Sequence, residues 1–376
     1  MLIVHETDRV SPGAETVVCR PVILRHDDTE ALFVVRDGKY SVPLIEVSRW
    51  QRIAPHLVSQ LRTVWNLEAI CRFSLAAEEA DNGARFVVLD AIDSSAPAPG
   101  GTAWASVHDL MWERSEALAM HGGLNRALQQ AKEYRFAEPP IPFTRPDWFK
   151  DVTVWVRCQL APLGLRLTGG WTQYNMGPAF ELIRYETEKQ PVWFKAVGEP
   201  NLQEFAIQMK LAKLCSSHIP EVLATHSGWH GWLMRDANAR PLDEIGDIEG
   251  WKTAARSLAE LQIQTIPKCE ALLRAGCDDL RVRPLRLQVG PFIDTIAQLM
   301  QLQPITPPPI LSRDNLCLIE VHLQRAIDEV EMLGIPNTIG HSDLNPGNVL
   351  VNNDGAVFLD WMQGHIGHPV VTFEYL

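Results

Sequence analysis

The segment from Gly340 to Trp361 constrains the fold of this chain more than any other. It joins a polar run, GHSDLNPGN, to a short apolar run, VLV, and then, after Asn353-Asp354-Gly355, to a second apolar run, VFLDW. Asn, Asp, Pro and Gly favour turns, and a turn of this kind between two apolar runs is typical of a β-hairpin. We therefore expect a polar loop followed by a tight hairpin, which folds the end of the segment back toward its beginning.

The same segment resembles the catalytic loop and metal-binding strand of the aminoglycoside phosphotransferase/choline-kinase family. That family carries His, any residue, Asp, four further residues and Asn, then a short hairpin, an apolar pair and Asp. The four polar positions are here His341, Asp343, Asn348 and Asp360. The resemblance implies a protein-kinase-like fold with two lobes. It also implies Asp343 as the catalytic base, Asn348 and Asp360 as ligands of Mg²⁺, and ATP or GTP as the phosphoryl donor.

The chemistry of these side chains fits the resemblance. Phosphoryl transfer needs an oriented nucleophile and compensation for the charge of the transferred group. The carboxylate of Asp343 can accept a proton from a hydroxyl group, and Asn348 and Asp360 offer the oxygen ligands that Mg²⁺ prefers. His341 is expected to hold the loop in place. The alternative is that these Asp and Asn residues only form turns, which is their commonest use in loops.

A second signal lies upstream, in the apolar run VWFKAV that contains Lys195. A lysine in the middle of an apolar strand needs a partner or a ligand. In the family, the matching lysine contacts nucleotide phosphates and pairs with a glutamate of the next helix, and Glu204 is the matching residue here. Glu204 has another interpretation, because Asn201 followed three residues later by Glu also fits a capping box at a helix start.

Two weaker resemblances complete the expected nucleotide site. The segment LTGGWT, with Gly169 and Gly170, resembles the family's phosphate-covering hairpin, where glycine lets the backbone approach the nucleotide. The run WLMRD, with Met234 and Asp236, falls where the family has the hinge that binds adenine. Backbone groups usually bind the base there, so the side chains of this run are uninformative.

Ahead of these signals the sequence predicts a separate domain. Proline-rich or small-residue stretches occur at Ser94–Thr102, Ala137–Pro146 and Pro304–Pro309, and we place the domain boundary at the second of them. Before that boundary the order is strand, strand, helix, strand, helix. The expected strands are Thr16–Leu24, Ala31–Val35 and Arg85–Leu89, and the expected helices are Arg52–Leu67 and Glu116–Phe136.

This order resembles, more weakly, a Nudix-like fold. The stretch from Ser59 to Leu67 lies where a Nudix enzyme carries its carboxylate-rich helix, and Leu61 and Leu67 fit the apolar positions of that helix. Every metal-binding carboxylate of the helix is missing, and divalent metal ions need those oxygens. A Nudix-like domain of this kind would bind, regulate or pack rather than hydrolyse. An unrelated α+β domain fits the pattern equally well.

The predicted fold class is α+β, with a Nudix-like α/β domain followed by a kinase-like bilobal domain. The expected limits are 1–140 for the first domain, 150–236 for the N-lobe and 237–376 for the helical C-lobe with the catalytic loop. Beyond the boundary, extended segments are expected at Trp155–Leu167 and Ala179–Arg184, around a turn-rich stretch from Thr168 to Gly177. The family normally continues well beyond the equivalent of Leu376, with helices that help to form the acceptor site. The chain is therefore expected to be either a fragment or a protein with a reduced acceptor pocket.

Composition narrows the class of partner. The formal net charge is -12, which disfavours nucleic acid, and 46% hydrophobic with 21% charged residues is typical of a globular protein. The seven cysteines are odd in number and lack a CxxC motif, which indicates reduced thiols in a cytoplasmic protein. No run approaches the roughly 18 apolar residues of a membrane span. The first ten residues are too short and too charged for a signal peptide.

These observations predict an ATP- or GTP-dependent O-phosphotransferase that acts on a hydroxyl group of a small molecule, either an aminoglycoside-like antibiotic or a metabolite. The alternative is a non-catalytic sensor or scaffold that binds a nucleotide or metabolite in a kinase-like pocket. The imperfect glycine segment and the short C-terminus favour that alternative. A protein kinase is disfavoured, because the loop reads His-Ser-Asp without Arg and no Asp-Phe-Gly follows.

Overall fold

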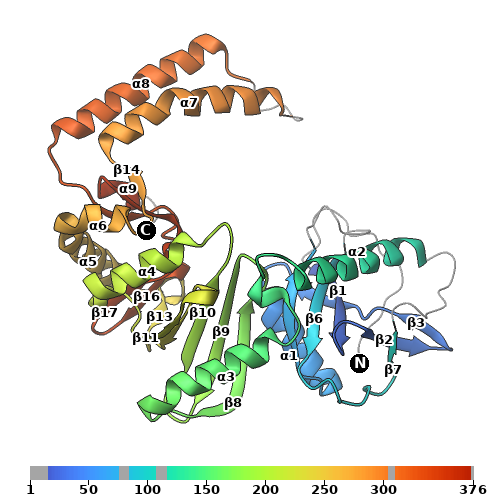
Figure 1. Cartoon of the computed structure of the whole chain (residues 1–376). Coiled ribbons are helices and arrows are strands. Elements are labelled where there is room, and N and C mark those ends of the chain that lie inside the picture. Colours follow the sequence, from blue (N-terminus) through green and yellow to red (C-terminus); the bar gives the residue numbers. More distant parts are fainter. Residues whose placement is uncertain (1–15, 76–83, 107–116, 304–309, 374–376) are drawn as a thin grey trace. The chain divides into compact units, whose positions relative to one another are not determined.

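The structure, a computed structural model, describes residues 16–75, 84–106, 117–303 and 310–373 (Figure 1). The predictions for the first ten residues and for Pro304–Pro309 lie outside these residues. The chain divides into two compact units, one formed by residues 1–202 and 222–236 and the other by residues 203–221 and 237–376. The domain limits expected from the sequence stay a prediction.

The first unit begins with a mixed seven-stranded sheet. Its central strand β1 (Thr16–Arg25) is antiparallel to β2 (Glu30–Arg36) and parallel to β6 (Arg85–Ala91). The three strands predicted from apolar runs are thus confirmed. The shorter strands of the sheet were not predicted, and they are β3 (Lys39–Ser41), β4 (Ile45–Ser48), β5 (Ala69–Ser74) and β7 (Thr102–Ser106).

Two helices cover the two faces of this sheet. Side chains of a strand alternate between its faces, so Ile23 of β1 contributes to one hydrophobic core and Leu24 to the other. Helix α1 (Ile53–Trp65) packs into the first core and α2 (Ala117–Arg135) into the second. Both helices were predicted. Many sandwiches of helices and a mixed sheet share this layering, so the Nudix-like resemblance stays a prediction.

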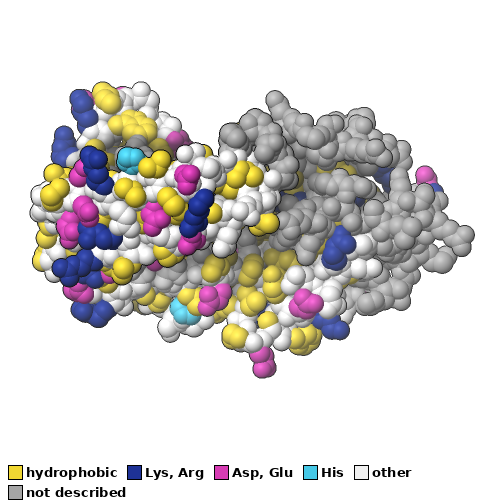
Figure 2. Space-filling view, turned by 90° about the horizontal axis from the view of Figure 1, so that it is seen from above, with side chains coloured by type: hydrophobic (Ala, Val, Ile, Leu, Met, Phe, Trp, Pro, Cys, Tyr) yellow, Lys and Arg dark blue, Asp and Glu magenta, His cyan; other side chains and the backbone are white. Residues whose placement is uncertain are grey.

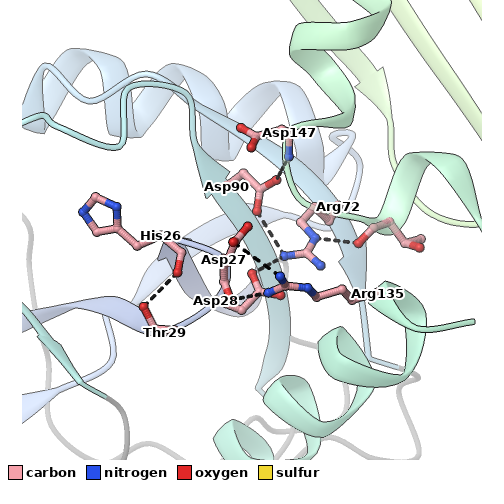
Figure 3. A network of polar contacts seen from close by, with 9 residues as sticks. His26, Asp27, Asp28, Thr29, Arg72, Asp90, Arg135 and Asp147 are labelled. Carbon is pink, nitrogen blue, oxygen red and sulfur yellow. Dashed lines mark hydrogen bonds and ion pairs between the residues drawn. The ribbon is translucent and has the colours of Figure 1, made fainter.

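A buried arginine ties this sheet to the proline-rich stretch that follows α2. Arg72 of β5 is 0% exposed. Its Nε donates to the carbonyl oxygen of Thr144 at 2.6 Å, and its Nη1 donates to Asp28 at 2.7 Å and to Asp90 at 3.1 Å (Figure 3). The backbone N–H of Asp147 donates to the other oxygen of Asp90 at 3.2 Å. A buried guanidinium needs such partners, and these anchor the stretch expected to be a linker.

The first unit also contains an antiparallel five-stranded sheet with the order β11-β12-β10-β9-β8. Helix α3 (Trp148–Leu160) covers one face, where Val156 packs with Ile183 and Phe194. The strands are β8 (Leu167–Asn175), β9 (Phe180–Thr187), β10 (Val192–Val197), β11 (Val222–His226) and β12 (Gly231–Arg235).

Two predictions for this region were wrong. The segment Trp155–Leu167, expected to be extended, begins inside α3, because Val152, Val156 and Leu160 recur at the four-residue spacing of a buried helix face. After α3 ends at Leu160, Ala161–Leu163 form a short 3-10 turn. Its Val and Trp residues favour strands by propensity, and packing against the sheet overrides that preference. The stretch from Thr168 to Gly177, expected to be turn-rich, is mostly strand β8.

The second unit is mainly helical, which agrees with the helical character predicted for the C-lobe. Its core gathers Leu211, Leu258 and Ile339, all fully buried. Helices α7 and α8 lie side by side with a small core of their own, formed by Val289, Ile293 and Leu316 (Figure 1). The helices are α4 (Gln203–Leu214), α5 (Ile248–Thr265), α6 (Cys269–Leu273), α7 (Val282–Gln301), α8 (Arg313–Met332) and α9 (Val370–Phe373).

Two three-stranded sheets of short strands accompany these helices. They contain the segment that carries the predicted catalytic residues. One sheet has the order β14-β18-β15 and the other the order β13-β16-β17. The strands are β13 (Arg240–Pro241), β14 (Asp278–Leu280), β15 (Thr338–His341), β16 (Val349–Asn352), β17 (Gly355–Phe358) and β18 (Gly364–Gly367).

The surface mixes charged and apolar side chains. On the described part of the face that Figure 2 shows, Lys and Arg side chains lie among Asp and Glu side chains, with hydrophobic side chains between them.

All seven cysteines are unpaired and four of them are buried, as expected for thiols. Across the described ranges, no helix combines the length and the apolar character that crossing a membrane requires.

The Asp90 carboxyl gives a test of the Arg72 network. Burial raises the pKa of Asp90 from 3.8 to about 7, although Arg72 opposes that shift. The native protein therefore keeps this proton at pH values where the unfolded chain has lost it, so stability is lost as the pH rises through this window. Asp90→Asn stays neutral. Its free energy of unfolding should rise relative to wild type by roughly 1–3 kcal/mol between pH 4 and pH 8.

Urea denaturation across this pH range measures the effect. Asp37→Asn is the matched control, because Asp37 is exposed in a turn and has a positive φ that Asn also tolerates. The same pH dependence in wild type and in Asp90→Asn would contradict the assignment.

Candidate active site

His341 connects the predicted catalytic loop to the strand that ends near Asp360. Its ring is fully buried at the end of β15. Nδ1 accepts a hydrogen bond from the backbone N–H of Asp343 at 3.1 Å, and Nε2 lies 3.0 Å from the carbonyl oxygen of Leu359. The proton must therefore sit on Nε2, which leaves the lone pair on Nδ1. Burial lowers the pKa of His341, which keeps the ring neutral as this pattern requires.

The loop after His341 is a compact turn. The Asn345 side-chain oxygen accepts a hydrogen bond from the N–H of Gly347 at 3.1 Å. The amide of Asn348 donates to the carbonyl oxygen of Asp343 at 3.0 Å. Leu344 is fully buried in the core and anchors the loop, while Asp343 is exposed. The turn thus brings Asp343 and Asn348 together and leaves the carboxylate accessible.

The predicted hairpin is confirmed. Strands β16 and β17 pair antiparallel around a turn in which the side-chain oxygen of Asn352 accepts from the N–H of Asp354 at 2.9 Å. At the open end of the hairpin, the N–H of Leu359 donates to the carbonyl oxygen of Asn348 at 2.9 Å. Asp360 follows directly on this bond. The structure therefore places Asp360 next to the chain segment that carries Asn348, as the sequence pattern predicts.

Asp360 has an unusual backbone conformation. Its φ of 63° and ψ of 55° are left-handed, which few residues other than Gly, Asn and Asp adopt. The conformation turns the chain directly into Trp361, which is 1% exposed. The indole ring of Trp361 lies 4.9 Å from the imidazole ring of His341. Strained backbone of this kind often occurs at functional sites, held in place by the packing around it.

A second histidine supports the loop, and the sequence did not reveal its role. His365 of β18 is 1% exposed, and its Nδ1 lies 2.9 Å from the hydroxyl of Ser342. Burial lowers the pKa of His365, so this ring is also held neutral. A β-carbon at Gly340 would lie 2.1 Å from Nε2 of His365, which explains the glycine there. The apolar run GHIG around His365 was the only signal of its burial.

The first unit presents Lys195 on the sheet face opposite α3. Lys195 is 7% exposed, and its ammonium lies 5.8 Å from the ring centroid of Phe180 and 5.7 Å from that of Trp232. Aromatic faces attract a cation at such distances. Two residues earlier on the same strand face, Trp193 donates from Nε1 to a carboxylate oxygen of Asp236 at 2.8 Å. Lys195 thus lies on a strand face rich in aromatic side chains.

The C-terminal part of the chain, which carries the catalytic-loop motif, matches a known protein family. Residues 198–372 match the model of the phosphotransferase enzyme family. This match spans just under half of the chain and includes Glu204, Asp343, Asn348 and Asp360. The resemblance drawn from the catalytic-loop motif is confirmed for this phosphotransferase-family region. Curated protein sequences yield no match to the chain.

Solved structures of phosphotransferases are also similar to the chain. Macrolide 2'-phosphotransferase MphH from Brachybacterium faecium is 16% identical, with 60% of this chain and 76% of that chain covered and a TM-score of 0.39. A choline/ethanolamine kinase family protein from Mesorhizobium loti is 17% identical, with 60% and 69% covered and a TM-score of 0.37. Spectinomycin phosphotransferase APH(9)-Ia, in complex with ADP and spectinomycin, is 13% identical, with 59% and 72% covered and a TM-score of 0.38.

The glycine segment lies upstream of the phosphotransferase-family region, in the antiparallel hairpin of β8 and β9. Gly169 and Gly170 lie within strand β8, at an irregularity in its pairing with β9, and not in the turn between the two strands. Gly177 occupies that turn with a φ of 124°. Gly198 lies close to it, because the N–H of Gly198 donates to the carbonyl oxygen of Ala179 at 2.8 Å. The signal that was missed is the Gly-Pro pair at Gly177, which often marks a turn.

Glu204 is buried near the start of α4 in the phosphotransferase-family region, and it is 2% exposed. The capping-box interpretation does not fit, because α4 begins at Gln203 and Glu204 is then only its second residue. The side-chain amide of Asn201 instead lies 3.5 Å from the carbonyl oxygen of Ala179. A buried carboxylate away from a cap needs a specific partner, which is the situation that the predicted pairing requires.

The clamp formed by His341 can be tested by substitution. His341→Ala removes two hydrogen bonds and leaves a cavity beside Trp361, so we expect a loss of about 2–4 kcal/mol in the free energy of unfolding. Denaturation with urea measures it. His322→Ala on the exposed surface of α8 is the control and should change stability by less than about 0.5 kcal/mol. Equal free energies of unfolding for the two variants would show that the His341 ring does not stabilise the fold.

Proposed function

We propose that this chain is a small-molecule kinase, which transfers a phosphoryl group from ATP or GTP to a hydroxyl group of an aminoglycoside-like antibiotic or a metabolite. One observation carries the proposal. His341 holds the turn of Asp343 and Asn348 against the strand end that leads into Asp360, within the region that matches the phosphotransferase family. Those are the groups that phosphoryl transfer to an alcohol requires.

Asp343 is the proposed catalytic base. Its carboxylate is exposed, so an acceptor hydroxyl can reach it, and the backbone around it is held by His341 and Asn348. A carboxylate placed in this way accepts the hydroxyl proton as the oxygen attacks and holds that oxygen in line. The amide of Asn345, which lies 3.3 Å from one carboxylate oxygen, orients the side chain.

Asn348 and Asp360 are the proposed ligands of Mg²⁺. Both side chains carry oxygen donors, and the backbone bond between Leu359 and Asn348 brings their chain segments together at the open end of the hairpin, which fits this ion. Among the residues that the structure describes, no group of three or more His, Cys, Asp or Glu side chains could hold a metal. Two protein ligands suit an ion that fills its other positions with phosphate oxygens and water. When bound, such an ion neutralises the charge of the nucleotide phosphates.

Lys195 is the proposed phosphate-binding cation, with Glu204 as its predicted partner. The aromatic rings around Lys195 stabilise its charge while it is largely buried. Met234 and Asp236 stay proposed nucleotide-binding residues, since Asp236 accepts a hydrogen bond from Trp193 on the same sheet face as Lys195. Gly169 and Gly170 also stay proposed phosphate-covering residues. The turn around residue 177 is the better candidate for that role.

The decisive experiment replaces the proposed base. Asp343→Asn keeps the shape of the side chain but cannot accept the proton, so transfer to a set of alcohol acceptors should fall by roughly 10²–10⁴-fold. Binding of Mg-ATP, measured by titration calorimetry, should change by less than about twofold. Asp354→Asn in the hairpin turn removes an exposed carboxylate nearby and should leave both values unchanged. Undiminished transfer by Asp343→Asn would refute the role of Asp343. Nucleotide binding without transfer by the wild type would favour the sensor.

The metal site gives an independent prediction. Asp360→Asn tolerates the left-handed backbone and removes only the charge. We expect the Mg²⁺ concentration that supports half-maximal nucleotide binding to rise by about tenfold or more, because Mg²⁺ prefers a carboxylate to an amide. A magnesium titration at fixed ATP measures this. An unchanged midpoint would show that the Asp360 carboxylate does not hold the ion.

A further inference from the structure

A basic groove lies between α4 and α6 of the second unit, and its lining contains none of the residues proposed for the active site. It has a volume of about 300 Å³. Its lining combines small and flexible apolar side chains with three cations. The apolar residues are Ala206, Met209, Ala271 and Ala275, and the cationic residues are Lys210, Lys213 and Arg274.

The three cations of this groove have no ion-pair partner among the described residues. Among the described residues, the side chains of Lys210, Lys213 and Arg274 take part in no ion pair or hydrogen bond. By contrast, Arg281, which follows α6, bonds to both Glu270 and Asp279. The chain has 46 acidic and only 34 basic residues, so three unpaired cations around one groove are not a consequence of overall composition. Their mutual repulsion falls when an anion lies among them.

The size and lining of the groove favour a small phosphate-bearing molecule. Lys and Arg are the usual protein ligands of phosphate, and Arg can bind it through two N–H groups. A volume of about 300 Å³ lies at the lower end for small-molecule sites, which suits one or two phosphate groups with a short organic part. A nucleic acid fits poorly, because the net charge of -12 repels a long polyanion.

The opposite face of α4 packs toward the candidate active site. Ile207 and Leu211, on the helix face away from the groove, are fully buried in the core that contains Trp361. Trp361 follows Asp360 directly and contacts His341. Helix α4 therefore lies between the groove and the turn that carries the proposed metal ligand.

We propose that the groove between α4 and α6 binds a phosphate-bearing small molecule, which holds α4 to α6 and so steadies the Asp360 turn. The binding site stands without the proposed catalytic function. Its effect on the nucleotide site rests on that function. Coupling between the two sites requires that the ligand bind more tightly to one position of α4 than to others. An anion that contacts both helices has this preference, because it binds best where α4 and α6 both reach it.

Binding is tested with inorganic pyrophosphate in titration calorimetry without Mg²⁺, on the full chain carrying Lys195→Ala to remove the proposed phosphate site. One pyrophosphate should bind per chain, and adding Lys210→Ala and Arg274→Ala should weaken it at least tenfold. Lys252→Ala is the matched control, because Lys252 is exposed on α5 and pairs with Glu249, and it should change binding by less than twofold. Absent binding, or binding unaffected by the groove substitutions, would overturn the proposal.

The coupling is tested by the apparent affinity for Mg-ATP with and without pyrophosphate, in the wild type and in Lys210→Ala/Arg274→Ala. Competition at the nucleotide site itself would affect both proteins equally, so only a difference between them reports on the groove. We expect pyrophosphate to raise the apparent Kd for Mg-ATP in both proteins. The factor of this increase should be at least fivefold smaller in the wild type than in the double variant. Equal effects would reject the coupling and leave the binding result standing. Failure of both proteins to bind ATP would refute the proposed kinase function, while the calorimetric test of the groove would still hold.

Discussion

The buried imidazole of His341 is the contact on which the candidate active site depends. One nitrogen accepts from the N–H of Asp343 and the other donates to the carbonyl oxygen of Leu359, so a single ring joins the loop to the end of the hairpin. Both bonds exist only for a neutral ring with its proton on Nε2. Burial lowers the pKa of His341 and thereby secures that state. The separation of Asp343 from Asp360 is thus set by a side chain that does no chemistry itself.

Buried apolar side chains next to the polar residues of the site hold the backbone of those residues in place. Leu344, between Asp343 and Asn345, is fully buried, and so is Phe358, two residues before Asp360. Each anchor restricts the backbone of the polar residues near it, which reduces the reorganisation that substrate binding would need. The left-handed conformation of Asp360 belongs to the same arrangement, because the burial of Trp361 holds the turn that requires it. Helix α4 extends this packing to the basic groove on its other face.

The first unit applies the same principle to buried charges. Arg72 sits among two carboxylates and a backbone carbonyl, and the segment that it anchors leads into α3. Helix α3 then covers one face of the five-stranded sheet, so that Lys195 is left on the other face with aromatic neighbours. A lysine that is largely buried needs compensation for its charge, and so does the carboxylate of Glu204, which is buried in the second unit. This need supports a functional interpretation of both residues over one based on local capping.

The sequence by itself determined the local elements of the site. The turn at Asn345, the hairpin after Asn352 and the spacing of Asp343, Asn348 and Asp360 depend on residues close together in the chain, and their hydrogen bonds follow from turn chemistry. Only the tertiary structure decided which segments are covered. The region around Trp155 has the composition of a strand but packs as a helix, because its partners lie on a sheet formed later in the chain. The partners of Arg72 and the meeting of Lys210 with Arg274 were equally hidden, since burial and charge pairing depend on residues that are distant in sequence.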